Sequence, residues 1–197
     1  MNTQAKSSFI SKTKVLSECA ILIALSTVLS FVKIWNMPWG GSITLLSMLP
    51  VALISVRHGL KQGLFCSFIY ACIQLAFGIV LDGLLGWGLT LGMLFACIFL
   101  DYILAFTAIG LSGTFAKHGL KGTILGTAMG VIIRFACHIL SGVYVFASAG
   151  KLWEGFETQN VWLYSTVYNS CYMLPEIVLT LVGTAIVFGA LKKRNML

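Results

Sequence analysis

Four ionisable side chains stand within long apolar stretches: Asp101, Arg134, His138 and Glu176. A charged group near the centre of a bilayer costs at least ~2.5–3.5 kcal/mol on insertion scales, so such groups usually have a function or a partner. Arg134 and His138 are four residues apart, which puts both on one face of a helix. These side-chain types can hold a small charged ligand, or they can neutralise one another.

The depths of these residues in the membrane coincide. If one helix enters from outside near Leu89, Asp101 lies about 18 Å along it, close to the midplane. Arg134 reaches a similar depth on a helix that enters from the inside near Gly122. A later helix adds polar and aromatic groups to the outer half of the membrane: Tyr164, Tyr168, Asn169 and Tyr172.

Two interpretations of this cluster stay open. Asp101 and Arg134 can form an internal pair that only neutralises two charges. Alternatively, the carboxylate accepts from a cationic or amine-bearing ligand while aromatic faces hold a planar cation by stacking and cation–π attraction. Glu176 follows Pro175 and can satisfy backbone groups freed by that proline, so we place it outside the pocket.

The elements that position these groups are transmembrane helices. Of 197 residues, 58% are hydrophobic and 10% charged, far from the composition of soluble domains. The second apolar stretch is short and is interrupted by Pro50, so it can be a tilted or re-entrant segment instead of an ordinary transmembrane helix. No cleavable signal peptide is apparent. We predict an all-α membrane protein, a single domain over residues 1–197 with six transmembrane helices in one bundle, at about 15–34, 43–57, 62–81, 89–115, 122–147 and 161–191.

The net charge of +7 is a topology signal. Basic residues gather before the first helix, between the second and third, between the fourth and fifth, and at the end of the chain. All these segments fall on one side of a six-span topology, so the positive-inside rule predicts that both termini are cytoplasmic. This distribution argues against nucleic acid as a partner. Only Lys33 and Lys151 are basic on the outer connections.

Several functional classes lack their motifs. There is no GxxxxGK[ST] phosphate loop for ATP hydrolysis, and the six cysteines form no CxxC pair, so we read them as packing residues and expect no metal site or cofactor. An intramembrane enzyme using His138 lacks a GxSG motif. A passive channel requires polar stripes along whole helices, whereas here the polar groups thin out toward the cytoplasm. We expect no catalytic residue.

Several stretches together resemble a known family, the thiamine-specific substrate-binding (S) components of energy-coupling-factor (ECF) vitamin transporters, or ThiT family. The resemblance covers nearly the whole chain. Its most specific stretches are residues 40–42 leading to 48–50 and 55–59, then 100–102, Arg134 with His138 and 141–142, and 162–165 with 168–169.

The resemblance implies thiamine bound near the outer surface and ATP-driven uptake in the plasma membrane of a bacterium. The implied partners are a transmembrane coupling subunit of the EcfT type and two ATPase subunits. The family's ligand-binding positions fall on Asp101, Arg134, His138, Phe146, Tyr164 and Asn169, with Trp35 or Trp39 covering the site. Some members have glutamate, lysine and tryptophan where this chain has Asp101, Arg134 and Phe146. Ala20 and Ala24 match the AxxxA motif through which S components dock. An S component for another vitamin or a thiamine precursor is the main alternative.

Overall fold

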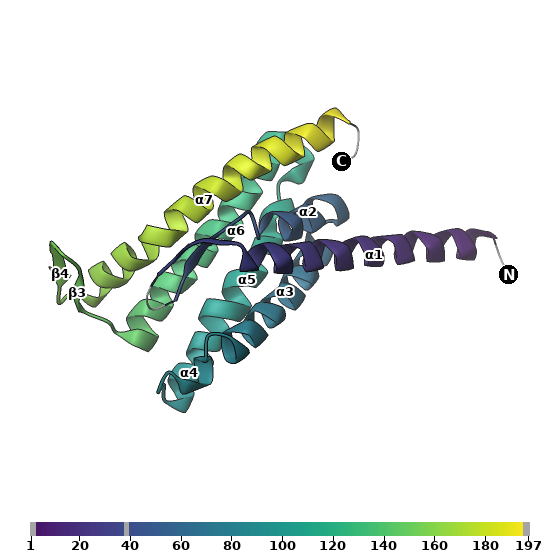
Figure 1. Cartoon of the computed structure of the whole chain (residues 1–197). Helices are drawn as coiled ribbons and strands as arrows, with labels where there is room; N and C mark the ends of the chain where they lie inside the picture. Colours follow the sequence, from purple (N-terminus) through teal and green to yellow (C-terminus); the bar gives the residue numbers. More distant parts are fainter. Residues whose placement is uncertain (1–2, 38–39, 195–197) are drawn as a thin grey trace.

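The computed structural model describes the backbone of residues 3–37 and 40–194, and the side chains within these ranges from Lys12 onward. Six helical rods make up the bundle (Figure 1). They are α1 (Thr3–Phe31), α2 (Leu49–His58), α3 (Leu60–Val80), a composite fourth rod, α6 (Gly119–Ser141) continued by η5 (Gly142–Phe146), and α7 (Val161–Lys193). The composite rod joins α4 (Leu91–Cys97), η2 (Ile98–Leu104), α5 (Ala105–Thr107) and η3 (Ala108–Gly113).

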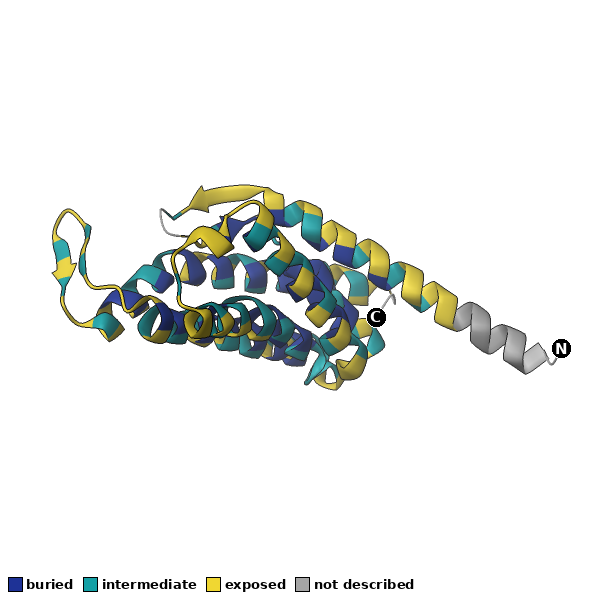
Figure 2. Cartoon of the chain, turned by 90° about the horizontal axis from the view of Figure 1, so that it is seen from below, coloured by how far each residue is buried: buried dark blue, intermediate teal, exposed yellow. Residues whose placement is uncertain are grey.

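Short elements connect the rods. β1 (Lys33–Asn36) and β2 (Ser42–Thr44) form an antiparallel pair before α2, and β3 (Gly150–Trp153) and β4 (Phe156–Thr158) form a second pair before α7. Single turns, η1 (Leu84–Gly86) and η4 (Ala116–His118), lie in two further connections. The β3–β4 hairpin stands at the end of the bundle opposite the start of α1 and the last turns of α7 (Figures 1 and 2).

The predicted all-α bundle is confirmed, but the second helix is shorter than expected. In the described part of the chain, five helices are long and apolar enough to cross a membrane: Lys12–Phe31, Leu60–Val80, Leu91–Gly113, Ala116–Phe146 and Val161–Lys193. α2 has only 10 residues, or about 15 Å, because residues 42–44 pair with β1 as strand β2 and Pro50 occupies the first helical turn. α2 therefore does not span a bilayer by itself.

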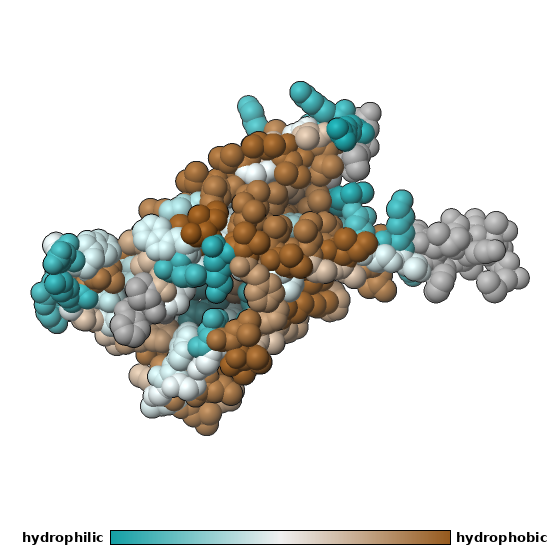
Figure 3. Space-filling view, in the orientation of Figure 1, coloured by the Kyte–Doolittle hydropathy of each residue, from teal (hydrophilic) through white to brown (hydrophobic). Residues whose placement is uncertain are grey.

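Apolar side chains cover the outside of the bundle as well as its core. Figure 3 shows apolar surface over the middle of the molecule, with hydrophilic side chains gathered mainly toward its ends. On α1, Leu16, Ile21 and Val28 are each more than half exposed, and Figure 2 shows exposed residues along much of this helix. Exposed apolar surface on this scale fits a lipid solvent and not water.

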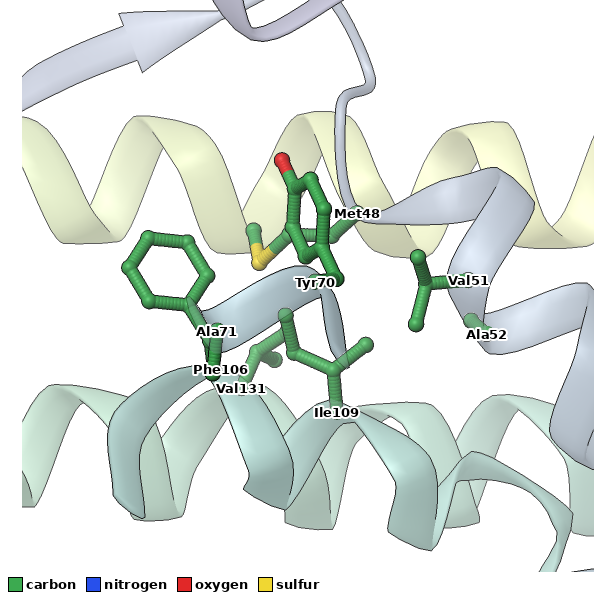
Figure 4. Close-up of a cluster of buried hydrophobic side chains, with 8 residues drawn as sticks. All are labelled: Met48, Val51, Ala52, Tyr70, Ala71, Phe106, Ile109 and Val131. Carbon is green, nitrogen blue, oxygen red and sulfur yellow. The ribbon is translucent and has the colours of Figure 1, made fainter. Parts of the chain in front are cut away.

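The main core lies where α2, α3, the fourth rod and α6 meet (Figure 4). Tyr70 of α3 meets Phe106 of α5 edge to face, with ring centroids 5.5 Å apart. Met48, Val51 and Ile109 pack around them and are fully buried. α2 is thus held within the protein, which suits a helix too short to span the membrane.

Small residues bring α2, α3 and η3 into close contact. The Ser55 hydroxyl donates to the carbonyl oxygen of Gly110 and accepts from the Gly113 amide at 2.9 Å. A Cβ on Gly110 would lie 2.7 Å from the Leu64 backbone, which leaves no room for a side chain. Close approach through small residues with hydrogen bonds between helices is how membrane helices associate.

α1 is the most peripheral span, because only 17% of the residues in its apolar stretch are buried inside the protein. Its Glu18 carboxylate lies 2.8 Å from Nη1 of Arg57, and its other oxygen lies 3.4 Å from Nε2 of His58, both at the end of α2. Cys19 and Ile23 face the bundle, whereas Ala20 and Ala24 are exposed. The small-residue face predicted on α1 is therefore open to the surroundings of the bundle.

Gly110→Ala is expected to lower stability by about 1–3 kcal/mol, because the added methyl group forces backbone movement between η3 and α3. The matched control is Gly92→Ala in α4, where a Cβ meets no atom within 4 Å. The thermal unfolding midpoint of the purified protein in detergent measures both variants. Equal midpoints would contradict this account of the packing.

Candidate functional site: a buried polar cluster between four helices

Asp101 lies in the π-helical segment η2, at the centre of a set of hydrogen-bond donors. Its Oδ1 accepts from Nδ1 of His138 at 2.8 Å. Its Oδ2 accepts from the Ser141 hydroxyl and from the Cys97 thiol, the latter at 3.3 Å. The wider turn of a π segment changes which way side chains face, and such turns are frequent at functional sites. The carboxylate is thus fixed between the fourth rod and α6.

Arg134 reaches Asp101 through His138. Its Nε donates to Nε2 of His138 at 3.3 Å, its Nη1 to Sδ of Met48 at 2.9 Å, and its Cζ lies 4.3 Å above the Phe106 ring. A guanidinium can only donate, so Nε2 of His138 is an acceptor and its Nδ1 carries the proton that is donated to Asp101. His138 is therefore neutral and its tautomer is fixed.

The direct Asp101–Arg134 pair is not formed. Three ion pairs within 4 Å occur among the described residues, and Arg134 takes part in none of them. The guanidinium positions the imidazole, and the imidazole positions the carboxylate. The side chain of Asp101 keeps 17% of its surface exposed, so a ligand can approach it.

Asn169 of α7 joins this cluster through the backbone of α6. Its Nδ2 donates to the carbonyl oxygen of Ser165 at 2.9 Å and to that of His138 at 3.3 Å, while its Oδ1 accepts from the Tyr172 hydroxyl at 2.7 Å. Gly142 permits this contact between α6 and α7, because an added Cβ would collide with the Ser165 side chain. Asp101, Arg134, His138 and Asn169 are thus brought together as predicted.

Three tyrosines spaced four residues apart form a ladder on α7. Ring centroids are 6.4 Å apart between Tyr164 and Tyr168, which stack, and 6.3 Å apart between Tyr168 and Tyr172, which meet edge to face. The Tyr172 ring also meets the edge of His138 at 6.0 Å. The ladder therefore brings aromatic faces up to the imidazole.

The connection between α1 and α2 rests on this ladder. The Tyr168 hydroxyl donates to the Gly40 carbonyl at 2.7 Å. Gly41 has a φ of +86°, and a Cβ there would lie 2.6 Å from the Tyr172 ring, so this position requires glycine. Gly40 and Gly41 are consequently held against α7, next to the polar cluster.

Glu176 does not satisfy groups freed by Pro175, which corrects the expectation from sequence. The group that a proline frees is a carbonyl, and a carboxylate cannot donate to it. Instead, Oε2 accepts from the Thr44 amide at 2.7 Å and Oε1 from the Thr44 hydroxyl at 2.6 Å. Glu176 is 1% exposed and also interacts electrostatically with Arg134. It anchors β2 to α7 and belongs to the electrostatics of the site.

The cluster holds more acidic than basic groups. Each carboxyl oxygen of Asp101 and Glu176 lies within hydrogen-bonding distance of a neighbouring group. One guanidinium, that of Arg134, belongs to the same cluster. The balance of two acidic groups against one fixed cation suits a positively charged ligand.

The remaining predicted residues lie farther out. Phe146 ends η5 and packs against Trp87, with ring centroids 5.9 Å apart. Trp35 lies on β1 and is 60% exposed. Trp39 lies outside the described residues. The ligand-contacting roles of all three remain predictions.

Three contacts of the site are not predicted by the local sequence: that of Cys97 with Asp101, and those of Met48 and Phe106 with Arg134. The sequence predicts a packing role for Cys97, whereas this residue lies one helical turn before Asp101 and its thiol reaches that carboxylate. Ser141 lies three residues after His138, on the same face. Nothing in the local sequence brings Met48 to Arg134, since they meet only through tertiary packing.

Thr44→Val is expected to destabilise the fold by about 1–3 kcal/mol, because it leaves one oxygen of buried Glu176 without a donor. Thr166→Val, on an exposed face of α7, serves as the control. Thermal unfolding in detergent compares them, and an unchanged midpoint in Thr44→Val would refute the anchoring role of Glu176.

Comparisons with known proteins agree with this geometry. The family model of the thiamine transporter protein (Thia_YuaJ) matches residues 16–196. The thiamine transporter ThiT of Bacillus subtilis (strain 168) is 32% identical over 191 residues, 88% of this chain and 89% of that protein. A thiamine transporter ThiT of Lacticaseibacillus paracasei is 27% identical over 181 residues, 85% of this chain and 83% of that protein.

A solved structure of ThiT from Listeria monocytogenes has the same fold, with a TM-score of 0.67 and 26% identity over 93% of this chain and 97% of that one. With five membrane-length helices and bacterial relatives, this is a multi-pass bacterial membrane protein. The chain belongs to the thiamine transporter protein family.

Proposed function

We propose that this chain is the thiamine-binding S component of an ECF-type importer, and that thiamine binds with high affinity at the Asp101 cluster from the extracellular side. The observation that carries the proposal is that a cluster built from Asp101, His138, Arg134 and Glu176 holds two acidic groups against one guanidinium, with tyrosine rings beside it. Thiamine is a monocation in which a planar thiazolium ring is joined by a methylene group to an amine-bearing pyrimidine ring, so its charge and its aromatic rings match such a site.

In this proposal, Asp101 holds the positive thiazolium. Oδ1 accepts one hydrogen bond, from His138, whereas Oδ2 accepts two, from Ser141 and Cys97, so Oδ1 keeps a lone pair for the ligand. Aromatic and imidazole faces near His138 and Phe146 sandwich the ring. Tyr164 and Asn169 read the aminopyrimidine edge, and Trp35 and Trp39 cover the site.

Arg134 acts as a positioning residue. It is buried, with its nitrogens engaged by His138 and Met48, and direct contact with a cationic ligand would be repulsive. Arg134 acts on the ligand indirectly, because it fixes the tautomer of His138, which in turn positions Asp101. Some family members have glutamate at position 101 and lysine at position 134, which carry the same charges as Asp101 and Arg134. These two differences therefore alter the geometry of the site more than the kind of ligand that it binds.

Transport requires partners that this chain does not contain. No phosphate-binding loop occurs in the sequence, so the chain is not an enzyme in this proposal, and ATP hydrolysis belongs to two ATPase subunits that act through a coupling subunit of the EcfT type. Ala20 and Ala24, exposed on peripheral α1, form the docking face for the coupling subunit.

Asp101→Asn is expected to weaken thiamine binding by about tenfold to a hundredfold while the protein stays folded, because the ligand loses a charged partner. Tryptophan fluorescence quenching on titration with thiamine measures the affinity. Asp82→Asn is the control, since Asp82 lies in an exposed outer connection where its backbone oxygen, not its carboxylate, accepts from Trp87. Unchanged affinity in Asp101→Asn would sink the assignment of the site.

The chain reconstituted alone in lipid vesicles is expected to bind thiamine saturably at one site and to accumulate none, even with ATP inside, because it has no site for the nucleotide. Radiolabelled thiamine retained after filtration separates binding from uptake. Concentrative uptake by the chain alone would reject the S-component proposal. Stronger competition by a hydroxymethyl pyrimidine precursor than by thiamine would favour the alternative ligand.

A further inference from the structure

A groove unrelated to the polar cluster lies between the start of α6 and the last turns of α7. It has a volume of about 740 Å³. Leu120 of α6 forms one wall, and small residues of α7, including Ala185 and Gly189, form the other. Lys192 and Lys193 stand at its end. The groove is thus apolar along its length and basic at its end.

The basic end has no acidic partner in the described part of the chain. Of the six acidic residues in the sequence, only Glu18 belongs to the cytoplasmic half, and it is paired with Arg57. The positive-inside rule explains lysines at this level, but it does not explain an apolar groove beneath them. Lys117 and Lys121, on the neighbouring segment that leads into α6, are also exposed and add to the same positive field.

Lys192 reaches across from α7 toward α6. A Cβ added to Gly119 would lie 2.9 Å from its Nζ, so the ammonium group sits against the first residue of α6. α7 has 33 residues, or about 50 Å, which exceeds the ~30 Å of hydrocarbon and brings its last turns to the headgroup level. The charged end of the groove therefore lies where lipid phosphates lie.

We infer that this groove binds an anionic phospholipid of the cytoplasmic leaflet, with an acyl chain along Leu120 and Gly189 and the headgroup phosphate between Lys192 and Lys193. Basic pockets between membrane helices on the cytoplasmic side commonly hold anionic lipids. An anionic phospholipid supplies both an acyl chain for the apolar part and a counter-charge for the two ammonium groups, whereas an apolar transmembrane helix would supply only the first, so the lipid is the better match.

The test is native mass spectrometry of the full chain purified in detergent and titrated with phosphatidylglycerol. One lipid is expected to remain bound, whereas phosphatidylcholine, with the same acyl chains, is not retained. Lys192→Gln with Lys193→Gln should weaken retention by about fivefold for each lysine removed. Gly189→Leu, which fills the groove and keeps the charge, should also weaken it.

Lys12→Gln with Lys14→Gln is the matched control, because it removes two exposed lysines from the same side of the membrane but far from the groove. Equal losses in the control and test variants would overturn the site in favour of non-specific charge attraction. Three other results would also overturn the proposed lipid site. These are equal retention of phosphatidylcholine, displacement of the lipid by millimolar inorganic phosphate, and a dimer mass without lipid. Thiamine quenching in every variant verifies that the protein remains folded.

Discussion

The hydrogen bond from His138 to Asp101 is the contact on which the arrangement of the site depends. It joins the fourth rod to α6 inside a largely apolar bundle, where a carboxylate without a partner would be costly. Arg134 fixes the proton on the correct nitrogen of His138, and Ser141 and Cys97 both donate to the second oxygen of Asp101. A buried charge of this kind is tolerable only when each of its partners is in place.

α7 connects this cluster to the outer loop. Its tyrosine ladder touches His138 on one side and the segment around Gly40 on the other, and Glu176 holds Thr44 one turn deeper. The first connection is therefore attached to the same helix that contacts the polar cluster. The polar cluster and the described part of the loop therefore both pack on α7.

The sequence predicted most of what depends on local pattern. Hydropathy located the long spans, and the polar residues at matching depths predicted that Asp101, Arg134, His138 and Asn169 meet. It did not predict that His138 stands between the two charges, because the route from Arg134 depends on Met48 and Phe106, which come from distant elements. It also assigned residues 43–57 to one helix, since apolar composition alone does not distinguish a buried strand followed by a short helix.

The π segments of the fourth rod and of α6 have a consequence for how such a site can change over time. Each residue of an α-helix turns the chain by about 100°, so one extra residue in η2 sets the helix before Asp101 out of phase with the helix after it. Deletion of one residue from η2 would rotate the Asp101 carboxylate away from His138. The part of the helix on one side of the deletion would keep the same surface toward the lipid. The geometry of the polar cluster is therefore open to change by insertion and deletion, as well as by substitution.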